Sequence, residues 1–229
     1  MFAIGHFALG YLTGKGSSKL LKTKFNLPLL LVASVIPDVD LLLQLQFPYL
    51  MHRGPTHSIL TLTVLMIPFF IIYRKKAVPY YAALLSHSLI GDFFTGGIML
   101  FWPLSSDFFS YGNLDVTSLP SVIAEIVLFA LTLVLMFKTK ELQSLLKPSK
   151  NNRVLFVAFV AVLGQLLRIG RNGVQESSLP ILLIVPSLFW LCIFACSMLV
   201  WLSVWRKAKN DGTVKRAAYA LVFEVYGKV

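Results

Sequence analysis

Long apolar runs separated by short polar stretches cover most of this chain. Seven runs are expected to form helices: Phe2–Thr13, Leu27–Gln46, Ser58–Tyr73, Val78–Phe101, Leu119–Phe137, Val154–Ile169 and Leu179–Trp205. Most reach the length that a bilayer core of about 30 Å requires of a helix. They are continuously apolar and lack the period-two alternation of membrane strands. The pattern therefore predicts an all-α, polytopic membrane helix bundle of about six to seven segments.

The first run, Phe2–Thr13, is short for a membrane span, so we expect a short or re-entrant N-terminal segment. Residues 1–205 are interpreted as one membrane domain and residues 206–229 as a basic cytoplasmic tail. The polar motifs described below fall within residues 1–103, whereas the apolar helices of residues 119–205 carry no signature.

Composition agrees with this interpretation. The 229 residues are 57% hydrophobic and 14% charged, whereas a soluble domain has about 25% charged residues. Mean hydropathy is +0.76. Cys192 and Cys196 lie four apart in one apolar run, which is typical of small residues that pack on a helix face.

The net charge of +11 is unevenly distributed. Basic residues follow the first, third, fifth and last runs: Lys15, Lys19, Lys22 and Lys24; Arg74, Lys75 and Lys76; Lys138, Lys140, Lys147, Lys150 and Arg153; and Arg206, Lys207, Lys209, Lys215, Arg216 and Lys228. If seven segments alternate, all basic residues except Arg53, Arg168 and Arg171 lie on one side. The positive-inside pattern then predicts an integral cell (inner) membrane protein with a cytoplasmic C-terminus. We expect membrane lipids as partners of the basic loops and no nucleic acid.

Ionisable side chains inside apolar segments are energetically expensive and point to function. Seven such groups reach the outer half of the predicted membrane region: His6, Asp38, Asp40, His52, His57, His87 and Asp92. Imidazole and carboxylate groups suit Zn²⁺, Mn²⁺ or Fe²⁺. Seven candidates exceed the needs of one tetrahedral zinc, so we expect one or two divalent ions, with zinc as the first choice.

Each residue also has a simpler structural interpretation. These alternatives are an interfacial His6, an Asp38 that satisfies backbone groups freed by Pro37, a solvated loop at His52 and Arg53, a helix-capping His57, and a hydrogen bond between His87 and Asp92. Chance does not usually place seven such groups at one depth, so the joint pattern favours a metal site. Glu125 either joins this site or reaches toward the membrane surface.

The ordered motifs resemble the YdjM-like family of inner-membrane metal-dependent hydrolases. They are Gly5-His6, Pro37-Asp38-Val39-Asp40, His52-Arg53-Gly54-Pro55-Thr56-His57-Ser58, Ser86-His87 followed by Asp92, Thr95-Gly96-Gly97 and Trp102-Pro103. The resemblance covers Met1–Pro103 and rests mainly on the stretch from His52 to Ser58. It implies a hydrolase with a metal site. A looser likeness links the motifs to the all-helical zinc-dependent phospholipase C and nuclease class.

One spacing departs from the family pattern. The family pattern is His-x-x-x-Asp, whereas His87 and Asp92 lie five apart. On a regular α-helix these side chains point about 140° apart. Both can reach one metal cluster only if Gly91 marks a π-bulge or a break. Otherwise one of them is not a ligand, or the two bind different metals.

These observations predict a membrane-embedded metal-dependent hydrolase acting on a phosphoester of a lipid or lipid-linked substrate. Asp38, Asp40, His57 and His87 are the first-choice ligands. The remaining candidates, His6, His52 and Asp92, complete a second metal position or support the first.

Four residues are expected to act in catalysis: Asp40, Arg53, Thr56 and Ser58. Arg53 is expected to clamp a phosphate oxygen, and the two hydroxyls to orient phosphate oxygens. Arg168 and Arg171 are expected to hold a headgroup.

Two other function classes fit the same residues. One is a non-catalytic metal- or lipid-binding membrane module, or an assembly subunit. The other is an ion-coupled transporter, because buried His and Asp residues also line ion paths. Clustering at one depth favours a site over a path. The sequence leaves the oligomeric state open.

Overall fold

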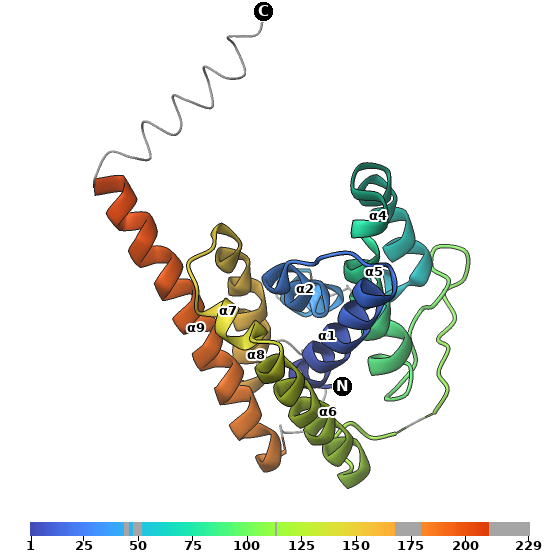
Figure 1. Cartoon of the computed structure of the whole chain (residues 1–229). Helices are drawn as coiled ribbons and strands as arrows, with labels where there is room; N and C mark the ends of the chain where they lie inside the picture. Colours follow the sequence, from blue (N-terminus) through green and yellow to red (C-terminus); the bar gives the residue numbers. More distant parts are fainter. Residues whose placement is uncertain (44–45, 48–51, 113, 168–179, 211–229) are drawn as a thin grey trace, which may run out of the picture.

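The computed structural model describes residues 1–43, 46–47, 52–112, 114–167 and 180–210. In this part of the chain all regular elements are helices, apart from an isolated bridge between Ile98 and Phe109 (Figure 1). The α-helices are α1 (Ala3–Leu20), α2 (Leu27–Ala33), α3 (Val39–Leu43), α4 (Ile59–Tyr73), α5 (Val78–Ser86), α6 (Leu119–Lys138), α7 (Glu141–Leu145), α8 (Leu155–Leu167) and α9 (Ile181–Asn210). The all-α prediction is confirmed.

Short 3-10 and π segments connect these helices. They are η1 (Ile36–Asp38), η2 (Pro55–His57), η3 (Arg74–Lys76), η4 (His87–Asp92) and η5 (Lys150–Val154); η4 is a π-helix and the others are 3-10 helices. Three of them, η1, η2 and η4, carry candidate metal ligands.

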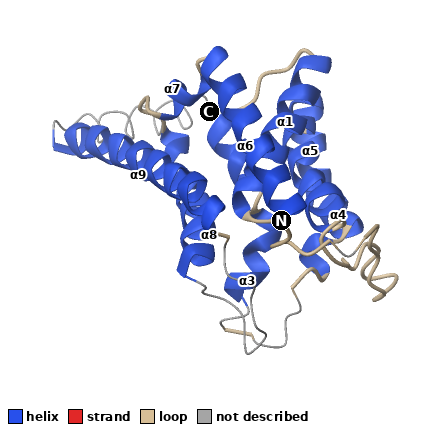
Figure 2. Cartoon of the chain, turned by 90° about the horizontal axis from the view of Figure 1, so that it is seen from below, coloured by secondary structure: helices blue, strands red, loops and turns tan. Residues whose placement is uncertain are grey.

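Three of the described helices are long and apolar enough to cross a membrane: Leu119–Lys138, Lys150–Leu167 and Ile181–Arg206. The expected six to seven spans are not confirmed. Other apolar runs fold into broken helices, and Figure 2 shows α3, which is part of the run Leu27–Gln46, as a short separate helix. The run Val78–Phe101, for example, leaves helical structure after Asp92 and continues as a loop.

Helix α1 forms the centre of the bundle and extends beyond its predicted end at Thr13. It packs against α5, α6 and α2. Close packing on α2 depends on glycine, because a Cβ at Gly10 would lie 2.2 Å from the Ser34 Cβ. A largely buried helix of this kind is a core element whose faces meet protein.

The predicted helix Leu27–Gln46 is broken near Pro37. Asn26 caps the start of α2 by accepting a hydrogen bond from the Leu29 N–H, and α2 ends at Ala33. Proline removes a backbone donor and clashes with the preceding turn, so the chain continues as η1 and then the short α3. The break places Asp38 and Asp40 at the ends of short segments.

Side-chain contacts fix the directions of the helices. Lys15, near the end of α1, pairs with Glu141, which follows α6, whereas Phe2 contacts Glu125 in the first half of α6. Helices α1 and α6 therefore run in the same direction. Helix α4 leaves the segment around His57, and α5 returns to His87 after the turn of η3.

Three predicted basic groups consequently lie at one end of the bundle: Lys15–Lys24, Arg74–Lys76 and Lys138–Arg153. The His and Asp motifs lie at the other end, as the contacts of Met1 with Asp92 and of Phe2 with Glu125 show. Helix α9 runs toward the basic end, because the Ser197 carbonyl accepts a hydrogen bond from Asn152 in η5. The described helices thus reproduce the predicted separation of basic loops from the candidate site.

Candidate metal centre

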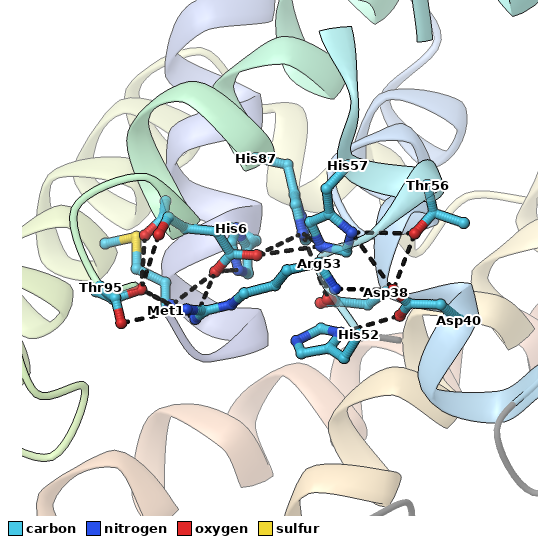
Figure 3. A network of polar contacts seen from close by, with 12 residues as sticks. Met1, His6, Asp38, Asp40, His52, Arg53, Thr56, His57, His87 and Thr95 are labelled. Atoms are coloured by element: carbon cyan, nitrogen blue, oxygen red, sulfur yellow. Dashed lines mark hydrogen bonds and ion pairs between the residues drawn. The ribbon is translucent and has the colours of Figure 1, made fainter. Parts of the chain in front are cut away.

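Four donor atoms from three segments converge at one end of the bundle. Asp38 ends η1, His57 ends η2, and His87 and Asp92 begin and end η4. These residues can each offer one ligand atom within 4.8 Å of all the others. Figure 3 shows the rings of His57 and His87 side by side, pointing toward Asp38.

The distances between these donors match those around a single metal ion. The Nε2 atoms of His57 and His87 are 3.1 Å apart. They lie 3.6 and 3.3 Å from Asp38 Oδ1, and 3.1 and 3.4 Å from Asp92 Oδ2. Metal–ligand bonds of 2.0–2.2 Å place tetrahedral donors about 3.3 Å apart. The residues present therefore fit a divalent ion.

Hydrogen bonds orient both imidazoles with Nε2 toward the cluster. The Nδ1 of His87 lies 2.7 Å from the Ser34 carbonyl, which can only accept, so Nδ1 carries the proton. The Thr56 hydroxyl donates to Asp40 Oδ2 at 2.9 Å and must therefore accept from His57 Nδ1, at 3.0 Å. In neutral imidazoles both Nε2 atoms then carry lone pairs.

The charges around His57 also favour a cation. Burial lowers the pKa of His57, but contacts with Asp38, Asp40 and Asp92 outweigh burial and raise the pKa well above 6.5. Three carboxylates in a buried region require positive charge, which a metal ion or a proton can supply.

The π-helix η4 resolves the unusual spacing of His87 and Asp92. The Phe93 N–H donates to the Ser88 carbonyl at 3.0 Å, which is the five-residue hydrogen bond of a π-helix. Residues five apart are neighbours on such a turn, so both side chains reach the same group. The sequence analysis required a π-bulge or break at Gly91 for both side chains to reach one metal cluster, and η4 is such a π-segment.

His6 borders the four-residue group but does not belong to it. Its ring stacks on His87 with centroids 3.7 Å apart, and its Nε2 lies 3.7 Å from Asp92 Oδ1. Both ring nitrogens are buried, and neither has a hydrogen-bond partner among the described residues. A Cβ at Gly91 would lie 2.4 Å from His6 Cε1, so glycine makes room for the ring.

Asp40 and His52 form a second candidate group with His57. Asp40 Oδ1 lies 3.0 Å from His52 Nδ1, and Oδ2 lies 3.4 Å from His57 Nδ1. Burial raises the pKa of Asp40, but hydrogen bonds from His52 and His57 outweigh it and lower the pKa to about 2. Both groups use the His57 ring, and an ion in the second group needs His57 Nδ1 without its proton. The geometry therefore favours Asp40 as the residue that orients His57 for one ion.

Arg53 holds the opposite side of Asp92. Its Nη2 lies 3.2 Å from Asp92 Oδ1 and 3.2 Å from Thr95 Oγ1, and its Nη1 lies 3.2 Å from the Thr95 carbonyl. A Cβ at Gly96 would lie 2.0 Å from Arg53 Nη1. These bonds leave Asp92 Oδ2 facing the imidazoles. Contact of Arg53 with a phosphate stays a prediction.

Thr56 and Ser58 both make intramolecular hydrogen bonds. Thr56 links Asp40 to His57, as described above. The buried Ser58 hydroxyl lies 3.1 Å from the Leu100 carbonyl and 2.8 Å from the Trp102 carbonyl, so it anchors the loop that follows η4. Their contact with a substrate phosphate also stays a prediction.

Two polar residues inside membrane-length helices support the start of α1. The Phe2 N–H donates to Glu125 Oε1 at 3.0 Å, and the Ala3 N–H donates to Gln165 Oε1 at 2.8 Å. Glu125 thus supports the site by holding the segment that carries His6. The sequence reasoning missed Gln165, although it is the one amide in the run Val154–Ile169. Arg168 and Arg171 lie outside the described residues, as does the tail beyond Asn210.

Fold and site together define an all-helical membrane protein with a buried His/Asp group that can hold a metal ion. The YdjM inner membrane protein family matches residues 1–174, which include all the candidate ligands. The chain belongs to this family, which confirms the resemblance. No curated protein and no solved structure matches the chain.

Proposed function

We propose that this protein is a metal-dependent hydrolase that acts on a phosphoester of a lipid or lipid-linked substrate at the outer half of the membrane. The observation that carries the proposal is the pair of Nε2 atoms of His57 and His87, 3.1 Å apart and both oriented inward by hydrogen bonds on Nδ1. Two facing lone pairs repel one another unless a cation lies between them.

Asp38, His57, His87 and Asp92 would hold the ion. Two carboxylates and two neutral imidazoles balance a divalent charge and suit zinc, with manganese or iron as alternatives. A divalent ion would supply the charge that polarises a phosphoester oxygen. It would also lower the pKa of water, so that hydroxide is available as the nucleophile at neutral pH.

The exposed side of this group indicates where a substrate would enter. The side chains of His57, His87 and Asp92 are at most 2% exposed, whereas that of Asp38 is 11% exposed. His52 and Arg53 border the group with 16% and 19% exposure. A phosphoester would therefore approach past Asp38, the most exposed of the four residues.

The loop after η4 supports a lipid substrate. It exposes large apolar side chains at Phe101, Leu104, Phe108 and Tyr111, and Ser58 ties it to the segment that carries His57. Aromatic residues favour the membrane–water interface. The positive-inside pattern supports an outward-facing site and a cytoplasmic C-terminus, because the basic groups lie at the opposite end.

The test is the metal content per chain of the full-length protein purified in detergent. We expect about one ion per chain, lost in Asp38→Ala and His57→Ala. Asp107→Ala is the matched control, because Asp107 is an exposed aspartate that bonds only Ser105 among the described residues. Metal-loaded protein is then assayed on short-chain phospholipids. Metal that binds without any ester turnover would leave the non-catalytic binding module as the function. A chain that stays metal-free after incubation with all three metals would overturn the proposal.

A further inference from the structure

A cavity of about 460 Å³, lined by both polar and apolar residues, lies at the basic end of the bundle, opposite the metal group. It is lined by the segment between α1 and α2 and by the segment from α7 to η5. In Figure 1 these segments meet where α2 faces α7 and α8. None of the candidate ligands lines the cavity, so the mechanism proposed above does not use it.

Two buried polar atoms of the lining residues have no hydrogen-bond partner in the part of the chain that the structure describes: Thr23 Oγ1 and Asn152 Oδ1. The Asn152 side chain is fully buried, and its Nδ2 donates to the carbonyls of Leu145 and Lys147 at 3.0 and 2.9 Å. A buried polar group without a partner is energetically costly, because it has lost its hydrogen bonds to water. These atoms therefore indicate a ligand that both accepts and donates hydrogen bonds.

The charges that line the cavity favour an anion. Lys24 lines it and has no ion-pair partner among the described residues. The one acidic lining residue is Glu141, whose Oε2 already accepts hydrogen bonds from Lys15, Tyr11 and Thr139. The cavity thus offers one unpaired positive charge and a hydroxyl donor at Thr23.

We propose that this cavity binds a phosphate group, either that of a membrane lipid headgroup or free phosphate. A phosphate oxygen accepts from Lys24 and Thr23, and a protonated phosphate oxygen or a headgroup hydroxyl or amine donates to Asn152 Oδ1. Phe25, Leu27 and Pro28 add an apolar wall that suits the glycerol end of a lipid. The surrounding lysines lie where the positive-inside rule places the headgroups of the cytoplasmic leaflet.

The experiment is a calorimetric titration of the detergent-purified full chain, treated with chelator so that the metal group does not contribute. The probes are inorganic phosphate, a water-soluble short-chain phosphatidylglycerol and the matching diacylglycerol, which lacks phosphate. Lys24→Gln removes the charge. Thr23→Val removes a hydroxyl that has no intramolecular partner, so the fold should tolerate it. Lys19→Gln, on the exposed end of α1 outside the cavity, is the control.

We expect saturable binding that is about tenfold weaker in Lys24→Gln and in Thr23→Val and unchanged in Lys19→Gln. Tighter binding of the lipid than of inorganic phosphate identifies a headgroup, and equal binding identifies free phosphate. The proposal would be overturned if neither inorganic phosphate nor phosphatidylglycerol binds saturably, or if diacylglycerol binds as tightly as phosphatidylglycerol. It would also be overturned if Lys19→Gln weakens binding as much as Lys24→Gln does. Because no metal is needed, the result does not depend on the hydrolase proposal.

Discussion

The Nε2 atoms of His57 and His87 face each other at 3.1 Å, and each ring is fixed by a hydrogen bond on its other nitrogen. Between two neutral rings this contact is repulsive, and a metal ion bound by both nitrogens would make it attractive. The stability of the protein should therefore depend on the metal. Removing the ion with a chelator is expected to lower the Tm. A ligand whose free concentration is a hundred times its Kd stabilises the folded state by about 2.7 kcal/mol.

The measurement is a thermal melt of the purified chain before and after chelation and after metal is restored. Asp38→Ala serves as the comparison, since its Tm should not respond to the chelator. An equal response of both proteins would place the metal effect outside this group.

The hydrogen bond from Thr56 to Asp40 gives a second prediction, because this pair orients His57 without supplying a ligand to the four-residue group. Thr56→Val and Asp40→Asn are each expected to weaken metal affinity about 10–100-fold. Competition with a chromophoric chelator measures the affinity. Thr61→Val is the matched control, because the buried Thr61 hydroxyl has no hydrogen-bond partner. Full affinity in Thr56→Val would show that His57 needs no such support.

The contact between Gly91 and His6 gives a third prediction. A Cβ at residue 91 would lie 2.4 Å from His6 Cε1, so Gly91→Ala must displace the ring that stacks on His87. Overpacking of this kind costs about 1–3 kcal/mol. We expect a lower Tm and weaker metal binding in Gly91→Ala.

Gly16→Ala is the control for this substitution. Nothing lies within 4 Å of a Cβ at Gly16, which is also helical. Alanine should raise helix stability there by about 0.5–1 kcal/mol. If both variants shift the Tm in the same direction, the crowding of His6 is not the cause.

Glu125 and the Phe2 N–H give a fourth prediction. The carboxylate accepts at 3.0 Å from a buried helix start that has no side-chain cap of its own. Glu125→Leu leaves this N–H unsatisfied and should cost about 1–3 kcal/mol, whereas Glu125→Gln keeps an acceptor and should cost less. Thermal melts of both variants test this order. A larger loss in Glu125→Gln would mean that Glu125 acts through its charge.

The clustering of the candidate ligands could be predicted from the sequence because charges in apolar segments need partners, but the first-choice set named Asp40 where the four-residue group has Asp92. The seven groups named from sequence do gather at one end of the bundle, and the π-helix at Gly91 was a stated condition for His87 and Asp92 to act together. The partner of His87 could not be predicted, because it is the backbone carbonyl of Ser34. Any residue could supply that carbonyl, so no side-chain pattern marks it.

The number of spans was harder to predict for a physical reason. Apolar length is the same signal in a helix that faces lipid and in one that is buried in protein. Helix α1 belongs to the second kind: it is largely buried, and its glycines Gly5, Gly10 and Gly14 pack against neighbouring side chains. The run around Pro37 is apolar enough for a long helix, but the proline and the two aspartates end it early.

The network of Lys15 and Glu141 at the basic end gives a pH-dependent prediction. Burial raises the pKa of Glu141, but hydrogen bonds from Lys15, Tyr11 and Thr139 outweigh it and lower the pKa below 4.5. The folded protein therefore holds this proton less tightly than the unfolded chain does. The stability from this network is fully present above the unfolded pKa of 4.5 and is lost as the pH falls toward the lower folded value.

Glu141→Gln removes the charge and should lower the Tm at neutral pH. The gap in Tm between wild type and variant should stay constant down to about pH 5 and shrink below it, because the wild-type carboxylate then becomes protonated. Melts in chelator keep the metal group from contributing. Asp107→Asn is the control, since Asp107 is exposed, bonds only Ser105 among the described residues, and should show a small Tm difference from wild type at every pH. A Glu141→Gln gap that does not change with pH would show that the network acts through packing, with no contribution from the ionised carboxylate.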